Sequence, residues 1–227
     1  MRKQQEIGNS DILIRPFKPS DRAAIRDISC DTADGGRPMD TLFPDREFIA
    51  DVLTRYYTDY EPDSIIVAEN ESRVIGYVLG TTNPGRHEVL TDVAVFPAAA
   101  VKTIMKGTLF HSETWHLIAI ALRVSFELAF KPDKIPSEYS SHLHINILPD
   151  HRGVNVGQRL LSGFIGHLKS SGVKGVTARV RSDNASGRRF FEKAGFISLG
   201  ESPIIRLRIA GKGQISFRLI TYGFKIE

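Results

Sequence analysis

The sequence has a single cysteine, Cys30, and a single tryptophan among its 227 residues. One cysteine excludes an intrachain disulfide and a cysteine-rich metal cluster. No run of about 20 apolar residues is present, which a membrane-spanning helix needs. The most apolar stretch, residues 115–130, is interrupted by charged residues, and the first ten residues are polar without an apolar signal core. We therefore expect a cytoplasmic protein with no membrane span.

The sequence also lacks any segment in which charges of one sign are concentrated. The chain has 30 Lys and Arg against 26 Asp and Glu, a formal charge of +4, with no long basic run. A nucleic-acid-binding surface normally needs a concentrated basic stripe, so we expect no nucleic acid partner. The mild excess suits a polyanionic small molecule. A composition with 41% hydrophobic and 25% charged residues is typical of a globular domain.

The periodicity of apolar residues predicts both strands and helices. Predicted strands cover residues 12–17, 64–69, 73–81, 142–148, 176–181, 196–199, 204–210 and 215–222, and predicted helices cover 23–28, 45–57, 156–169 and 186–194. Helices alternate with strands in the second half, and hairpins occur at both ends, which favours a mixed α/β sheet. We expect one domain over residues 1–227, with an insertion at about 83–141. Within it, Asn83-Pro84-Gly85 predicts a turn, and residues 115–130 predict an amphipathic helix.

The most informative segment runs from Ile147 through Leu-Pro-Asp-His-Arg-Gly-Val-Asn-Val to Gly157 and leads directly into a predicted helix. A strand, a glycine-containing loop and a helix start bring several free backbone N–H groups together at the positive end of the helix dipole. Such a nest binds an anion, and a pyrophosphate suits it best. The candidate binding residues here are Ile147, Leu148, Arg152, Gly153, Val154, Asn155, Val156, Gly157 and Gln158.

This segment resembles motif A of the GCN5-related N-acetyltransferases (GNAT), Arg/Gln-x-x-Gly-x-Gly/Ala. Arg152 and Gly157 match its ends, while Asn155 stands where the first motif glycine is expected. Asparagine tolerates a positive φ better than most residues, so the turn can survive.

A second segment, 184–196, resembles motif B of the same family, Asn-x-x-Ala-x-x-Phe-Tyr-x-Lys-x-Gly-Phe. Gly187 replaces the usual alanine, and Phe191 replaces the usual tyrosine; the matching positions are Asn184, Phe190, Lys193, Gly195 and Phe196. The longer pattern is also similar to that of bacterial acetyltransferase-like proteins related to the C-terminal domain of O-GlcNAc hydrolases.

The resemblance implies a GNAT-like α+β fold with a mixed, mostly antiparallel central sheet flanked by helices and a helical insertion. It implies acetyl-CoA as co-substrate, no metal, and transfer of an acetyl group to a primary amine of a small-molecule, amino-sugar or peptide acceptor. It also assigns cofactor contacts to the motif A residues and to Asn184, Gly187, Phe190, Phe191 and Lys193. Asn184 could instead cap a helix, and Arg152 could be an ordinary surface arginine.

The family's splayed strands imply a catalytic role for the strand before motif A, where His142, His144 and Asn146 alternate on one face. Amine acetylation needs a base, and the pKa of histidine is near neutrality, so His144 is the preferred base, directly or through water. Asn146 is the second catalytic candidate. Alternatively, this face packs under a helix. Phe191 has no hydroxyl to protonate the departing thiolate, which Tyr139 or Ser141 could do instead.

Other functions remain open at this point. Asn155 and Phe191 favour a binding module that holds acyl-CoA without turnover. A different nucleotide-binding class is disfavoured because the loop lacks the Gly-Lys-Ser/Thr ending of a P-loop, and an RNA-directed enzyme is suggested only by the basic pI. The predicted helix at 115–130 could cover the site, form a homodimer contact or rest on a membrane. His87 and His111 lack metal-ligand spacing to any cluster, so no metal is expected.

Overall fold

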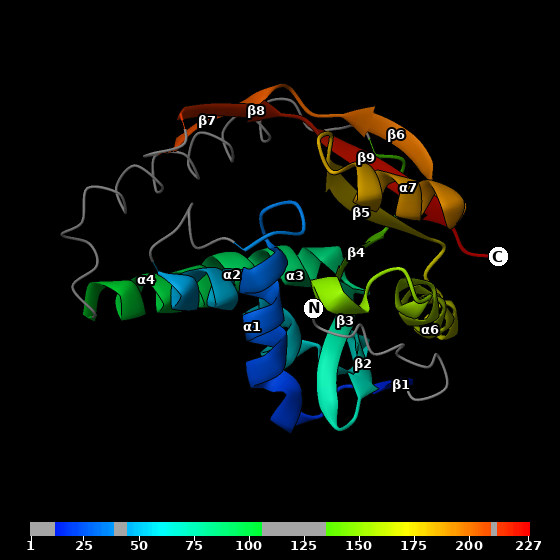
Figure 1. The fold of residues 1–227 in the computed structure, drawn as a ribbon, viewed down its shortest axis with the longest axis horizontal. Coiled ribbons are helices and arrows are strands. Elements are labelled where there is room, and N and C mark those ends of the chain that lie inside the picture. The colour runs from blue at the N-terminus through cyan, green and yellow to red at the C-terminus, as the bar shows by residue number, and fades with distance from the viewer. Residues whose placement is uncertain (1–11, 39–44, 106–134, 210–212) are drawn as a thin grey trace, which may run out of the picture.

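The computed structural model describes residues 12–38, 45–105, 135–209 and 213–227 (Figure 1). The helix predicted at 115–130 lies outside the described residues. Within these ranges no helix is both long and apolar enough to cross a membrane.

A seven-stranded sheet with the order β1-β2-β3-β4-β5-β9-β6 forms the centre of the molecule, and β7 and β8 pair in a separate hairpin. Only the pairing of β4 with β5 is parallel, so the sheet is mixed and mostly antiparallel, as the sequence predicted. The strands are β1 (Ile12–Pro16), β2 (Ile65–Asn70), β3 (Arg73–Thr81), β4 (Ser141–Ile147), β5 (Gly175–Arg181), β6 (Ile197–Glu201), β7 (Ile205–Ile209), β8 (Gly213–Phe217) and β9 (Leu219–Lys225).

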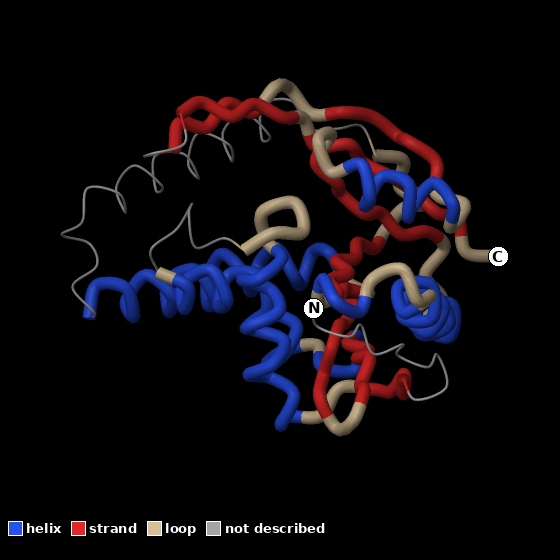
Figure 2. Tube along the Cα trace, viewed as in Figure 1, coloured by secondary structure: helices blue, strands red, loops and turns tan. Residues whose placement is uncertain are grey.

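Helices cover both faces of this sheet (Figure 2). The α-helices are α1 (Arg22–Thr32), α2 (Arg46–Tyr60), α3 (Pro84–Leu90), α4 (Phe96–Met105), α6 (Val156–Ser170) and α7 (Ala185–Lys193). Short 3-10 helices occupy Pro19–Asp21, Pro62–Ser64 and Pro149–His151, and a π-helix, Thr91–Val95, joins α3 to α4.

Two hydrophobic clusters hold these helices against opposite faces of the sheet. One cluster buries the apolar side of α6, including Leu160 and Phe164, together with Phe191 of α7. The other buries Ile25 of α1 and Tyr57 of α2 against β2 and β3. Apolar residues recur at helical spacing in these segments, so each helix has one side suited to the core.

The sheet opens between β4 and β5. Their register contains only Ser141 with Val176, His142 with Thr177 and Leu143 with Ala178. From His144 to Ile147, β3 is the only described strand that pairs with β4. Among the described strands, none therefore pairs with the second half of the β4 edge that faces β5, and β4 diverges from its parallel neighbour before the loop.

Two predictions about secondary structure were wrong. The turn expected at Asn83-Pro84-Gly85 is the start of α3: the Asn83 side chain caps the helix by accepting from the Arg86 N–H, and Pro84 occupies the first turn. Both residues are ordinary helix-start signals. The single strand expected at 215–222 is divided at Arg218, whose backbone bonds with Ser182 at the end of β5 and so leaves the β7–β8 hairpin.

Gly80 provides a test of the packing between β3, β4 and α6. A methyl group at this position would collide with the His142 carbonyl oxygen and the Phe164 ring. We expect Gly80→Ala to lower the free energy of unfolding by about 1–3 kcal/mol. Gly166→Ala, at an open position of α6, is the matched control and should be neutral or stabilising by up to about 1 kcal/mol. Urea unfolding measures both, and equal midpoints for the two variants would contradict this packing.

Candidate active site

The loop between β4 and α6 turns sharply at two left-handed residues. Gly153 has φ 83° and Asn155 has φ 65°. Asn155 is the N-cap position of α6, although its side chain makes no capping hydrogen bond. The left-handed conformation at Asn155 was predicted from the tolerance of asparagine for positive φ, and the structure confirms it.

The backbone amides of this loop are unused within the described part of the chain. The first amide of α6 with a partner is Arg159, which donates to the Asn155 carbonyl oxygen at 3.2 Å; His151 and Arg152 donate within the preceding turn. No described group accepts from the N–H groups of residues 153–158. These donors lie at the positive end of a 15-residue helix, and such an arrangement is suited to an anion.

Arg152 has partners on both sides of the loop. Its Nε donates to the Ile147 carbonyl oxygen at 2.9 Å, and its Nη2 donates to the Gly36 carbonyl oxygen at 3.0 Å. The side chain therefore ties the turn between α1 and α2 to the end of β4. Partial burial lowers the pKa of its guanidinium. With two of its nitrogens engaged, Arg152 positions the loop as well as supplying positive charge.

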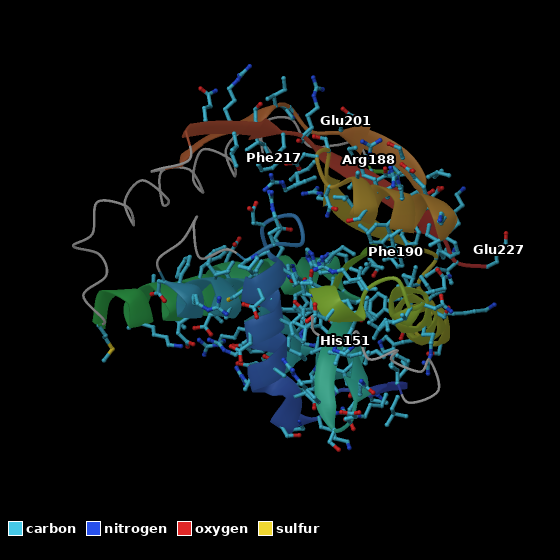
Figure 3. The ribbon with its side chains drawn as sticks, in the orientation of Figure 1. His151, Arg188, Phe190, Glu201, Phe217 and Glu227 are labelled. Carbon is cyan, nitrogen blue, oxygen red and sulfur yellow. The ribbon has the colours of Figure 1, made fainter. Side chains whose placement is uncertain are left out.

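The other motif residues bring α7 close to the start of α6. A Cβ on Gly157 would lie 2.8 Å from the Phe190 ring, so this glycine permits the contact between the helices. Phe190 is labelled in Figure 3, between α7 and α6. Asn184 caps α7 by accepting from the Gly187 N–H at 2.9 Å. A Cβ on Gly187 would lie 2.8 Å from the amide of Asn184. The capping alternative for Asn184 is thus confirmed.

Phe191 lies in the hydrophobic core and not on the open side of α7. Its ring stacks on Tyr222 at 6.2 Å and meets Phe196 edge-on at 5.0 Å. Direct contact between Phe191 and a bound molecule, expected from the motif, therefore finds no support in this position. Lys193 is exposed in the last turn of α7.

On β4, His142, His144 and Asn146 share the face that is covered by α1 and α2, as the alternation predicted. The Asn146 amide donates to the buried Tyr77 hydroxyl at 2.9 Å. His144 lies at the point where β4 leaves β5, and its ring is exposed. Of the three, His144 is therefore the residue open to a substrate.

His144 is exposed at its surface, but the surrounding protein still removes part of its hydration. This desolvation is the larger cause, and the positive charges of His87 and Arg179 are the smaller causes, of a pKa lowered to about 4. Burial, together with His144, His87 and Arg179, lowers the pKa of His142 well below the usual value. Both imidazoles are therefore neutral at pH 7. The pKa near neutrality that made His144 the preferred base is not found: with a pKa of about 4 the ring is free to accept a proton but holds it weakly.

Two groups of the opened sheet carry no signal in the sequence. Tyr57 and His87 reach His142 from α2 and α3, and no local motif marks either residue. The second group is an ion pair, Arg181 to Asp34 at 2.5 Å, which joins the end of β5 to the turn after α1. In Figure 1 this turn extends from the half of the molecule that contains α1 toward β5 and the β7–β8 hairpin.

The two hydroxyls considered as proton donors are both buried. Ser141 donates to the Thr81 carbonyl oxygen at 2.6 Å, and the Tyr139 ring packs against Gly175 and Gly223. Neither hydroxyl is placed at the opening between β4 and β5.

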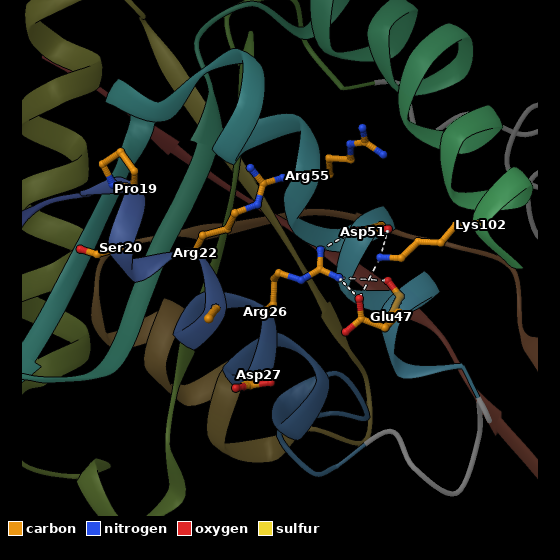
Figure 4. A pocket seen from close by; sticks show the side chains of 10 residues that line it. Pro19, Ser20, Arg22, Arg26, Asp27, Glu47, Asp51, Arg55 and Lys102 are labelled. Atoms are coloured by element: carbon orange, nitrogen blue, oxygen red, sulfur yellow. Dashed lines mark hydrogen bonds and ion pairs between the residues drawn. The ribbon is translucent and has the colours of Figure 1, made fainter. Parts of the chain in front are cut away.

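A separate depression of about 630 Å³ lies between α1, α2 and α4 (Figure 4). Four of its charged residues pair with one another: Arg26 contacts Asp51 and Glu47, and Lys102 contacts the same two acids. Arg22 and Arg55, which also line it, both contact Asp59. The depression is distinct from the motif A loop.

Comparison with known proteins agrees with this geometry. Residues 126–196 match the model of the acetyltransferase (GNAT) family. The structure of SsHAT is similar over 96% of this chain and 99% of that chain, with 25% identity and a TM-score of 0.72. An N-acetyltransferase from Staphylococcus aureus Mu50 (16% identity, 95% and 99% covered, TM-score 0.56) and yncA from Salmonella typhimurium, solved with its cofactor acetyl-CoA (15% identity, 96% and 95% covered, TM-score 0.54), share the fold.

The opened mixed sheet, the loop before α6 and these similarities define a GNAT-type acetyltransferase fold. Residues 126–196 match the family's model, and the fold that the two motifs implied is confirmed.

Asn155 allows a test of the left-handed turn. We expect Asn155→Ala to lower the free energy of unfolding by about 1 kcal/mol, since left-handed backbone is costly for a residue with a Cβ and no polar side chain. Asn155→Gly should leave it unchanged within about 0.5 kcal/mol or raise it. Gln158→Ala, in the regular part of α6, is the control. Thermal and urea unfolding measure the stability of the three variants. Equal stability of the Ala and Gly variants would contradict a left-handed conformation at residue 155.

Proposed function

We propose that this protein is an acetyl-CoA-dependent N-acetyltransferase that acts on a primary amine of a small-molecule, amino-sugar or peptide acceptor. The observation that carries the proposal is the row of free backbone amides at residues 153–158 beside the unpaired edge of β4. The amides offer an anion site, and the strand edge offers backbone groups to an extended amide-containing chain. Coenzyme A has both features, a diphosphate and a pantetheine arm.

The residues present fit such a co-substrate. The amides of Gly153 to Gln158 would hold the diphosphate, and the edge of β4 from His144 to Ile147 would pair with the pantetheine amides. Phe190, which is half-buried beside Gly157, would form an apolar side of the same opening. The group supplies an activated acyl thioester when bound.

In this reaction the residues of the chain must remove a proton from the acceptor ammonium. An alkyl ammonium has a pKa of about 10 and is not a nucleophile until it loses a proton. Once the amine is neutral, its lone pair would form the new C–N bond as the C–S bond breaks. The nitrogen then loses a second proton, and the departing thiolate takes one proton to become the free thiol. Starting from an ammonium acceptor, each turnover therefore releases one net proton, which the protein must accept and pass to solvent.

His144 is the group we propose as base. It is neutral at pH 7, exposed, and placed where β4 diverges from β5. Arg179 lies on β5, and its charge acts on the His144 ring. The same positive charge disfavours an ammonium nearby and so favours the neutral amine. Asn146, held by Tyr77, would orient the acyl or acceptor amide group.

A second candidate function is an acyl-CoA-binding module with little or no turnover. It is favoured by one observation: Phe191 has no hydroxyl and the hydroxyl-bearing Tyr139 and Ser141 are buried, so none of the three donates a proton to the leaving thiolate. A thiol with a pKa of about 8.5 leaves adequately without an acid, however. We therefore favour the enzyme. The cytoplasmic location and the homodimer anticipated from the sequence stay predictions.

Removal of the proposed base should produce a pH-dependent defect. We expect His144→Gln to lower kcat by about 100-fold or more near pH 7, the usual contribution of a general base. The defect should shrink as the pH approaches the pKa of the acceptor amine, because the amine then loses its proton unaided. KM for acetyl-CoA should stay within about twofold. His167→Gln, on α6 away from the opening, is the control, and a pH-independent loss in His144→Gln would argue against the base.

The diphosphate site can be tested on the unmodified protein. We expect acetyl-CoA to bind at least about 100-fold more tightly than acetyl-pantetheine, because several charge-assisted hydrogen bonds are worth about 1.5–3 kcal/mol each. Isothermal titration calorimetry measures both affinities. Equal affinities would overturn the anion site. Tight binding of acetyl-CoA without thiol release on any member of an amine panel would support the binding module instead.

A further inference from the structure

The hydroxyl of Tyr57 lies between two histidine rings that come from different parts of the chain. Its oxygen is 2.7 Å from Nε2 of His142 on β4 and 3.3 Å from Nε2 of His87 on α3. Tyr57 itself is only 3% exposed. The two rings also meet each other edge-on, with centroids 4.7 Å apart. Three titratable groups from α2, α3 and β4 therefore form a continuous hydrogen-bonded set.

The chemistry of a phenol fixes the direction of these hydrogen bonds. A tyrosine hydroxyl has one proton to donate, and a neutral imidazole nitrogen either donates or accepts, depending on the tautomer. No other partner for the Tyr57 hydroxyl is present among the described residues. Because a buried O–H without an acceptor is costly, Tyr57 donates to one histidine. Both hydrogen bonds form together when the Nε2 of the other histidine carries a proton, that is, when the two Nε2 atoms are in opposite protonation states.

The directions of the two hydrogen bonds at the Tyr57 hydroxyl can reverse. Once His142 has taken an incoming proton at Nδ1, its Nε2–H bond can break as Tyr57 takes that proton, while the Tyr57 O–H bond breaks as His87 Nε2 takes the original hydroxyl proton. His142 is left neutral with its proton on Nδ1, His87 becomes the imidazolium, and one proton has moved from β4 to α3 without an oxidant or reductant. The phenol returns to its starting form after each passage.

We propose that Tyr57 and His87 form the exit of a proton relay that carries the acceptor's proton from His144, by way of His142, to the surface at α3. The relay rests on the proposed acetyl transfer, which releases a proton at His144. The His142 and His144 rings have centroids 5.8 Å apart, a separation that one water molecule can bridge. His87 lies on a helix with a half-exposed ring, where it can exchange its proton with solvent.

The charges around the three rings favour this direction. The charges of Glu61, Glu88 and Asp92 favour a proton on His87 and act against the burial that lowers its pKa. His142 and His144 instead face the positive charge of Arg179, which disfavours protonation there. Tyr57 is held neutral because burial and the Glu61 carboxylate raise its pKa. The surrounding charges therefore favour a proton on His87 over one on His142 or His144, and an accepted proton moves toward the surface.

Kinetics with a single-atom deletion test the relay. We expect Tyr57→Phe to lower kcat by about tenfold or more while KM for acetyl-CoA stays within about twofold. The solvent deuterium isotope effect on kcat should rise, because proton escape then limits turnover. Tyr60→Phe, on the same helix and outside the hydrogen-bonded set, is the matched control. A Tyr57→Phe enzyme with wild-type kcat and isotope effect would overturn the proposal.

A second variant separates the relay from simple packing. His87→Ala should lose kcat to a similar degree and regain at least half of it in imidazole buffer, since imidazole can take the proton from the Tyr57 hydroxyl. Tyr57→Phe should not respond to imidazole. Loss of activity in His87→Ala that imidazole fails to restore would indicate a structural role for α3 and would count against the relay.

Nitrogen NMR of the histidines decides the hydrogen bonds without turnover. We expect the Nε2 atoms of His142 and His87 to have opposite protonation, and Tyr57→Phe to abolish that complementarity. Two protonated Nε2 atoms, or unchanged spectra in Tyr57→Phe, would overturn the relay. If the wild-type protein releases no thiol with any amine, the proposed acetyl transfer fails, and the NMR result still shows whether the pairing exists.

Discussion

The parallel pairing of β4 with β5 ends after Leu143 and Ala178, and the rest of the site depends on where it ends. Up to that point β4 is an interior strand with both edges paired. Beyond it, one edge of β4 is free, and the strand delivers the chain to the loop whose amides remain unused before α6. Phe190 and Ile147 pack around Gly157 at the same place, so α7 and α6 meet where the strands part. One interruption of the ladder thus leaves, among the described residues, a strand edge without a partner strand next to a loop with unused backbone donors.

Electrostatics then distinguish the two sides of this opening. The loop side presents backbone donors at the positive end of α6, which favours negative charge. The β4 side presents imidazoles that are kept neutral by partial desolvation and by Arg179. Glu61 lies further from the opening, where it accepts hydrogen bonds from Tyr56, Thr81 and Thr82 and keeps its pKa low. Its negative charge acts to raise the pKa of Tyr57 and of His87, so a proton is favoured on the His87 side of the hydrogen-bonded set.

The sequence contained the local features of this site but not its long-range contacts. The strand–loop–helix signal at 147–157, the left-handed Asn155 and the shared face of His142, His144 and Asn146 depend on residues close in the chain, and all were predicted. Tyr57 and His87 meet His142 only because α2 and α3 pack over β4, and no spacing encodes that. The burial of Phe191 was missed for the same reason. The motif places Phe191 on a helix, but its burial depends on contacts with Tyr222 and Phe196, which are distant from the motif or follow the helix.

The turn after α1 joins the two halves of the opened sheet. Arg181 on β5 binds Asp34 of this turn, and Arg152 binds the neighbouring Gly36 carbonyl oxygen. The Arg181 and Asp34 side chains are 12% and 8% exposed, whereas Arg37 and Asp183, which flank them, are 69% and 48% exposed. Dissolved ions screen exposed charges far more than enclosed ones. The rim of the opening should accordingly keep its shape in concentrated salt, while the interactions of its outer charges are weakened.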